Sequence, residues 1–269
     1  MANTIPGFIP EELRQLARFI PRSGWDVIDW KPMLGSLRTV SWRYVSRRGV
    51  SQLAARTRAV AEPVRLVTGL DNASQLTDIH DKRRLRCLGD DILRLYFAQW
   101  LVAPGMFIDL RQARFGADDE GLLFNPNGLW IELRTDFREG MTALYRSFYS
   151  SDDNAFDKAL RQMGMLHKDL SPSAAEELKQ LLFNHFGIEQ RSQRFSIDAF
   201  KASFDELFTF FVSHDYKLHS DFVFVGFYLI TLYLTLEQLG QSHNVRKICA
   251  EVLLRPGAAS PSPYRQRQG

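Results

Sequence analysis

Residues 105–134, GMFIDLRQARFGADDEGLLFNPNGLWIELR, decide the fold, because this stretch interrupts an otherwise helical pattern. Two short apolar runs, Leu122–Phe124 and Leu129–Leu133, flank Asn125-Pro126-Asn127-Gly128. Proline presets φ for a turn and Asn-Gly tolerates positive φ, so the runs are predicted to pair as a β-hairpin near residues 121–133. A second turn signal, Asp118-Asp119-Glu120-Gly121, comes directly before it.

Apolar residues recur at helical spacing on both sides of this stretch, so a mostly α fold is predicted. The run Phe222–Leu236 is predicted to form a buried central helix, because its fifteen residues span only about 22 Å, short of the roughly 30 Å hydrocarbon core of a bilayer. Three regions are expected: a basic helical region over 1–63, a helical domain over 64–254 and a disordered Pro/Ser/Gln-rich tail over 255–269.

Positive charge is concentrated near the N-terminus. The net charge is +3, and residues 1–66 hold 11 Lys/Arg against 5 Asp/Glu. Basic residues interleaved with tryptophans are typical of a surface that contacts an anionic membrane or a protein partner, although a solvated arginine-rich helix face has the same composition. The candidates for this surface are Trp25, Trp30, Arg38, Trp42, Arg43, Arg47 and Arg48. Neither zinc-finger spacing nor the pattern of an RNA-binding sheet is present, so no specific nucleic-acid binding is predicted.

Familiar catalytic and metal-binding motifs are missing from the sequence. The six histidines are scattered, and HExxH, GxSxG and Walker A patterns do not occur, so no metal site is predicted. Cys87 and Cys249 lie far apart and fit buried thiols in a reducing compartment. The N-terminus has no secretory pattern. A cytoplasmic protein is expected, with a peripheral position on the inner membrane face as an extension of this expectation.

The order of elements resembles the C-terminal lobe of the UbiB (AarF-type) atypical kinase-like family over residues 64–248. In that family a helix leads to a G-F-F-H-A-D-P-H-P-G-N catalytic loop, a hairpin and a D-F-G metal loop. Here Gly105-Met106-Phe107-Ile108-Asp109 stands where the catalytic loop begins, and Trp130–Arg134 stands where the metal loop lies. The resemblance implies a kinase-like fold and a link to isoprenoid-quinone or lipid metabolism at a membrane surface.

The chain departs from the family at the positions that carry the chemistry. Leu110-Arg111-Gln112-Ala113-Arg114 replaces the His-Pro-Gly-Asn element, Glu132 replaces the metal-binding Asp, and Arg134 replaces the Gly. The KxGQ element has no counterpart, so most of an N-terminal lobe is missing. Phosphoryl transfer needs a lysine on the phosphates and carboxylate and amide ligands for Mg²⁺. Only Asp109 and Glu132 are left as catalytic candidates; alternatively, both are ordinary carboxylates paired with Arg111, Arg114 or Arg134.

Three functions remain open from the sequence. The first is a catalytically inactive UbiB-like pseudokinase that acts as a binding or scaffold protein, with a protein partner and a lipid or anionic membrane surface as ligands. The apolar segment 220–240 and the phenylalanine-rich segment 198–212 are candidates to line a lipid-sized pocket, against the alternative that they form a plain core. The second is a helical adaptor in a larger assembly. The third is a residual Mg-ATP-dependent enzyme that uses Asp109 and Glu132.

Overall fold

The computed structural model describes residues 14–16, 18–20, 22–27, 55, 57–58, 61–127, 129–150, 152–166, 169–186, 192–219 and 221–254. The described chain is mostly helical with small sheets, as the sequence predicts. Its α-helices are α2 (Arg22–Val27), α5 (Lys82–Leu101), α6 (Thr135–Ser150), α7 (Asp153–Gln162), α8 (Pro172–Phe186), α9 (Ile197–Ser213), α10 (Asp221–Leu239) and α11 (Val245–Leu253). Its strands are β1 (Arg65–Leu66), β2 (Ser74–Gln75), β3 (Met106–Phe107), β4 (Phe115–Asp118), β5 (Gly121–Phe124), β6 (Trp130–Ile131), β7 (Gln193–Arg194) and β8 (Ser242–His243).

Most of the predicted tryptophan and arginine surface lies outside this description. Trp25 belongs to α2. The other six members, Trp30, Arg38, Trp42, Arg43, Arg47 and Arg48, lie outside the described residues, and so does the tail predicted to be disordered, 255–269. The membrane or partner surface therefore stays a prediction.

The hairpin turns earlier than the sequence predicts. β5 pairs antiparallel with β4, and the pair Asp118↔Gly121 closes a two-residue turn at Asp119-Glu120. Gly121 has a φ of 129°, a conformation that side-chain-bearing residues rarely adopt, which is why glycine fits this turn. The prediction that Asn125–Gly128 forms the hairpin turn was wrong: that segment leads from β5 to β6, which pairs antiparallel with β3 in a separate sheet.

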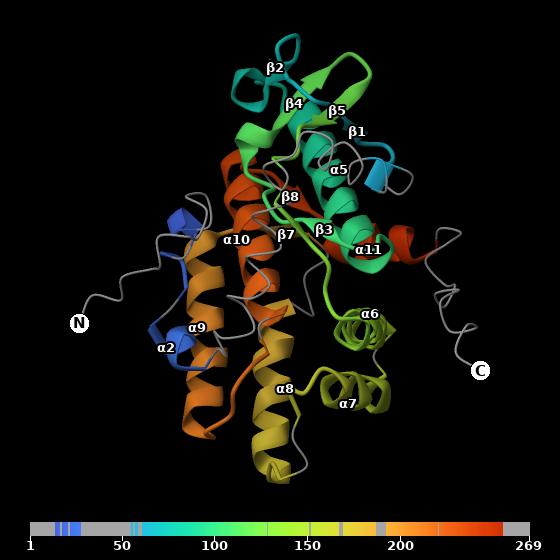
Figure 1. The fold of residues 1–269 in the computed structure, drawn as a ribbon. Coiled ribbons are helices and arrows are strands. Elements are labelled where there is room, and N and C mark those ends of the chain that lie inside the picture. Colours follow the sequence, from blue (N-terminus) through green and yellow to red (C-terminus); the bar gives the residue numbers. More distant parts are fainter. Residues whose placement is uncertain are drawn as a thin grey trace.

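The structure has three small sheets, of which the four-stranded one lies at one end of the molecule, while β3, β7 and β8 lie nearer its middle (Figure 1). The largest has the strand order β1-β5-β4-β2, in which β1 runs parallel to β5 and the other pairs are antiparallel. β3 pairs with β6, and β7 pairs with β8. Each sheet packs on helices rather than on another sheet, with α5 against both β5 and β3.

Helices α5 and α10 form the centre of the core. Asp81 caps α5 by accepting from the backbone N–H groups of Arg83 and Arg84. α10 is long and apolar enough to cross a membrane by length and composition, but 67% of its apolar window is buried inside the structure, as expected of a core helix. Tyr96 on α5 stacks on Tyr228 of α10 with ring centroids 4.8 Å apart. These two helices carry the rest of the fold.

α11 packs on α5, and four other helices, α6 to α9, pack as two pairs toward the other end of the molecule (Figure 1). α6 packs closely on α7, and α8 packs on α9, which α2 covers from its other side. The pairs meet through α10 and through side chains such as Phe156 of α7 and Phe183 of α8, whose rings stack 4.9 Å apart. Space between the pairs is therefore set by side chains rather than by close backbone contact.

Gly89 on α5 is predicted to be required for packing against β8. A Cβ at this position would lie 2.3 Å from Cε1 of His243, a fully buried ring held by a 2.7 Å contact from Nδ1 to Asp90 Oδ1. Gly226 on α10 is the matched control, because its added Cβ would meet nothing closer than Phe204 at 3.8 Å. We expect Gly89→Ala to lower the free energy of unfolding by about 1–3 kcal/mol. Gly226→Ala should keep or raise it, since alanine favours helix. Equal thermal midpoints for both variants would contradict this packing.

Candidate functional site

Asp109 lies in a buried cluster of charged and polar side chains just after β3. Its carboxylate accepts from Arg111 through both oxygens, from Nε to Oδ1 at 2.7 Å and from Nη2 to Oδ2 at 2.8 Å. Arg114 Nε donates to Oδ2 at 3.0 Å, and Asn127 Nδ2 donates to the same oxygen at 2.6 Å. The Asp109 side chain is fully buried, while the two arginines keep about a quarter of their side-chain surface exposed. The acceptor capacity of the carboxylate is thus used inside the protein.

The two guanidiniums keep Asp109 ionised. Burial alone would raise the pKa of this carboxyl group, but the hydrogen bonds and charges of Arg111 and Arg114 outweigh burial and hold the pKa below its ordinary value of 3.8. A cation would have to displace both arginines to reach Asp109. The pairing with Arg111 and Arg114 is one of the alternatives that the sequence leaves open for this residue.

Glu132 does not meet Asp109. The register Phe107↔Trp130 and Met106↔Ile131 places Asp109 beyond one end of the β3–β6 ladder and Glu132 beyond the other. Four residues of extended chain, about 13 Å, separate these two ends. Glu132 is exposed and accepts from Trp130 Nε1 at 3.2 Å. The two carboxylates therefore cannot share one metal ion in this arrangement.

Asn127 is the residue that sequence reasoning missed at this site. Its side chain donates to Asp109 and accepts from the backbone N–H of Leu129, so it links the loop after β3 to the chain entering β6. The Asn-Pro-Asn-Gly pattern is the available signal, but by local rules it predicts a turn and not a contact with Asp109. Arg134, the third arginine considered, pairs with Asp221 at the start of α10, from Nε to Oδ2 at 3.1 Å. Within the described ranges, no group of three His, Cys, Asp or Glu side chains could hold a metal ion.

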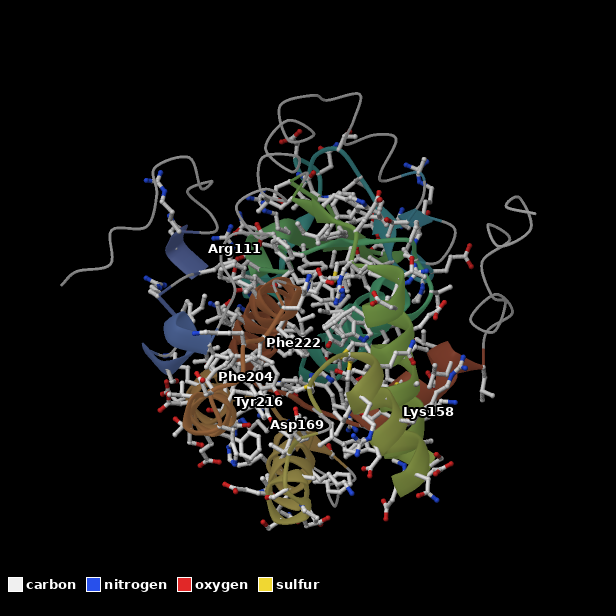
Figure 2. The ribbon with its side chains drawn as sticks, turned by 60° about the horizontal axis from the view of Figure 1, so that its bottom comes forward. Arg111, Lys158, Asp169, Phe204, Tyr216 and Phe222 are labelled. Atoms are coloured by element: carbon white, nitrogen blue, oxygen red, sulfur yellow. The ribbon has the colours of Figure 1, made fainter. Side chains whose placement is uncertain are left out.

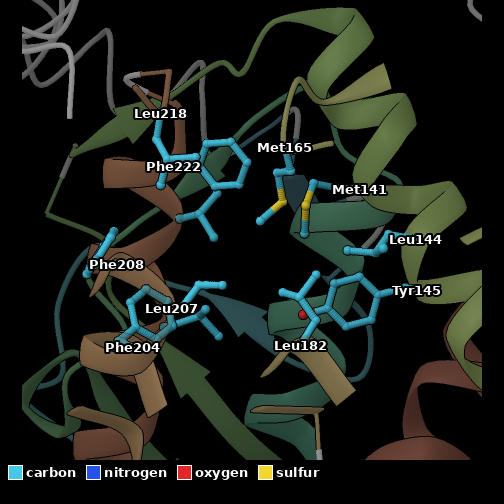
Figure 3. Close-up of a pocket in the computed structure, with 12 residues that line it drawn as sticks. Met141, Leu144, Tyr145, Met165, Leu182, Phe204, Leu207, Phe208, Leu218 and Phe222 are labelled. Carbon is cyan, nitrogen blue, oxygen red and sulfur yellow. The ribbon is translucent and has the colours of Figure 1, made fainter. Parts of the chain in front are cut away.

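An apolar pocket lies between the two helical pairs and encloses about 560 Å³ of empty space, part of it open to solvent. Figure 3 shows its wall, in which the Tyr145 hydroxyl is the one side-chain oxygen. Helices α6, α8, α9 and α10 and two connecting segments contribute to the wall. The lining residues are Met141, Leu144, Tyr145, Met165, Leu182, Phe204, Leu207, Phe208, Leu218, Phe222, Val225 and Leu229.

The sequence identified part of this wall. The segments 198–212 and 220–240 contribute six of the lining residues, Phe204, Leu207, Phe208, Phe222, Val225 and Leu229. The contributions of α6, Met165, Leu182 and Leu218 were missed, because periodicity marks an apolar face without saying which other face lies opposite it. None of the residues of the Asp109 cluster lines the pocket, and Figure 2 shows Arg111 above Phe204 and Phe222 in the view, so the pocket and the Asp109 cluster are separate sites.

A second cavity adjoins the apolar pocket and holds about 410 Å³ of empty space. Tyr145 and Leu229 line both spaces. Four tyrosines line the second one, so we refer to it as the tyrosine cavity. Its lining residues are Leu93, Tyr96, Phe97, Tyr145, Tyr149, Gln193, Phe195, Leu229, Leu232, Tyr233 and Val245. Neither wall contains a charged side chain.

Comparison with known proteins does not assign a family or a function. No protein-family model matches the sequence, and no curated protein matches it. The function must therefore be argued from these sites.

We predict that Asp109→Asn destabilises the protein in a pH-dependent way. The asparagine leaves Arg111 and Arg114 without their buried counter-charge, which should cost about 2 kcal/mol of unfolding free energy at neutral pH, below the usual value for a buried pair because both arginines are partly exposed. The pKa of Asp109 is lowered in the folded state. Its ionised form therefore contributes to the free energy of unfolding above pH 3.8, and this contribution is lost as pH falls below that value.

Denaturant unfolding at a series of pH values checks this prediction. The difference in unfolding free energy between wild type and Asp109→Asn should become smaller as the solution is made acidic. Asp119→Asn, in the exposed turn of the hairpin, is the matched control and should give no gap. A gap for Asp109→Asn that stays constant through the acidic range would contradict the ionised pairing.

Proposed function

We propose that this chain is a non-catalytic binding protein of the UbiB-like pseudokinase type, and that its ligand is a lipid-sized apolar molecule. The observation that carries the proposal is the apolar pocket, a hollow between the helical pairs that is partly open to solvent and is lined almost wholly by hydrocarbon side chains. A pocket with a single hydroxyl and no charged side chain is suited to hydrocarbon, because apolar contact is then its main source of affinity.

The order of elements supports the kinase-like part of the proposal. The hairpin β4–β5 follows the loop that carries Asp109 and precedes the segment that returns to pair with β3. This is the order expected between a catalytic loop and a metal loop. Asn127, just before the returning strand β6, contacts Asp109 and so joins the two segments.

The chemistry of the same loop argues against phosphoryl transfer. Catalysis there depends on carboxylate and amide groups that coordinate Mg²⁺ and on a lysine that neutralises the phosphates. Two arginines and the Asn127 amide occupy the Asp109 carboxylate, and Glu132 lies at the other end of the β3–β6 ladder. A binding role therefore accounts for the arrangement better than a residual enzyme does.

Binding of a neutral fluorescent apolar probe such as Nile red tests the proposal. Val225 is a buried pocket residue on α10, and Val225→Trp would fill the space that the probe needs. We expect this variant to weaken probe binding by at least about tenfold and to unfold in a single cooperative thermal transition, with a midpoint lowered by the extra volume at a buried position.

Val212→Trp on α9 is the matched control, because Val212 is 46% exposed and lines neither cavity. It should bind the probe as wild type does. Equal loss of binding in both variants, or saturable binding that Val225→Trp leaves unchanged, would place the probe elsewhere and overturn the proposal.

A thermal-shift titration with ATP, with and without Mg²⁺, separates the binding role from a residual enzyme. A ligand at a hundredfold excess over its Kd stabilises the folded state by about 2.7 kcal/mol. We expect no Mg²⁺-dependent shift at millimolar ATP, because arginines occupy the carboxylate that would hold the metal. A shift that is present in wild type and absent in Asp109→Asn would support the enzyme instead.

A further inference from the structure

The tyrosine cavity differs from the apolar pocket in offering hydroxyl groups. Tyr96 and Tyr145 share a hydrogen bond between their hydroxyls, 3.1 Å apart. Burial raises the pKa of Tyr233 to about 12, and the neighbouring Gln193 side chain lowers it in part. The hydroxyls of Tyr96 and Tyr145 are therefore engaged with each other, and the Tyr233 hydroxyl faces Gln193.

Tyr149 is the fourth tyrosine and stands apart from the others. Its ring contacts Tyr145 and Phe148, and its backbone carbonyl accepts from Arg246 at 2.7 Å. In the described part of the chain, its hydroxyl has no hydrogen-bond partner. Burial raises the pKa of this phenol, so the group is a neutral donor at physiological pH. Tyr149 is half-buried and its hydroxyl is not among the buried unpartnered atoms of the described residues, so the hydroxyl lies within reach of solvent. A hydroxyl that lines a cavity and bonds to water rather than to protein can exchange that water for a ligand oxygen.

The two cavities share Tyr145 and Leu229 in their walls. The apolar pocket is lined almost wholly by hydrocarbon, whereas the tyrosine cavity also presents phenol hydroxyls. We propose that they form one site for an uncharged amphiphile, with its hydrocarbon tail in the apolar pocket and a neutral oxygen of its head group accepting a hydrogen bond from Tyr149. This inference rests on the proposed function and adds the chemical class of the ligand.

The charge of the head group follows from the walls. A carboxylate or phosphate carried into the tyrosine cavity would have no cation among its lining residues. Arg246, whose charge acts on the Tyr149 phenol, lies outside the lining, is exposed to solvent and already donates to the Tyr149 carbonyl. Burying a charge without a direct partner is more costly than burying a hydroxyl or carbonyl that forms a hydrogen bond. The site therefore selects alcohols, ketones or esters over fatty-acid anions of equal chain length.

Binding of dodecanol, dodecane and dodecanoate to the full chain tests the inference, with affinities measured by displacement of the apolar probe. Tyr149→Phe keeps the ring and removes the hydroxyl. We expect it to weaken dodecanol binding about fivefold, the loss of one neutral hydrogen bond, and to leave dodecane binding unchanged. Tyr216→Phe is the matched control, because Tyr216 lines neither cavity, and it should leave both affinities unchanged.

Comparing each variant with wild type for the same ligand cancels the different solubilities of the ligands. Dodecanoate should bind wild type more weakly at neutral pH than in acid, where it is protonated. Equal effects of Tyr149→Phe on dodecanol and dodecane, or dodecanoate binding as tight as dodecanol at neutral pH, would overturn the inference and leave the proposed function intact. Failure of all three ligands to displace the probe would contradict the proposed function itself.

Discussion

The fold depends on how α5 and α10 satisfy the backbone of one irregular buried segment. Residues 108–110 follow β3 and are fully or almost fully buried, so their peptide groups need partners inside the protein. Thr231 and Thr235 on α10 donate to the carbonyls of Ile108 and Leu110 at 2.8 and 2.6 Å. Gln99 on α5 accepts from the N–H of Phe107 at 2.8 Å.

These hydrogen bonds connect the Asp109 cluster to α10, one of the helices that line the apolar pocket. Gln99 also donates to the Tyr228 hydroxyl at 3.0 Å, which in turn donates to the carbonyl of Tyr96, so α5 and α10 are fixed to each other as well as to the loop. The loop then holds Asp109 next to its arginines, and α10 presents its other residues to the apolar pocket. The same helix thus supports the charged cluster near the sheets and the apolar space between the helical pairs.

The sequence predicted those features that follow from local chemistry. Helical periodicity identified the helices, and the apolar length of 222–236 correctly indicated a buried central helix. The prediction of the hairpin turn was wrong because two turn signals lie seven residues apart and both satisfy local rules. Which one closes a hairpin depends on the partner that β6 finds in β3, a contact between distant parts of the chain. Asn127 was misjudged for the same reason: its side chain serves Asp109, eighteen residues away, as well as the local turn.

The pocket was the feature least accessible to sequence reasoning, because it depends on how far apart two helical pairs stand. Apolar stripes on α6 and α9 are the same whether the helices touch or leave a space. In this fold the lining includes Met141 and Met165, flexible side chains that readily adapt to fill irregular gaps, and yet space remains. Closer packing would bring more atoms into contact and should stabilise the protein, so the open arrangement forgoes stability. A ligand that bridges the pairs would restore those contacts. Its binding energy would then add to the stability of the folded state, and most of all to that of the half of the molecule formed by α6, α7, α8 and α9.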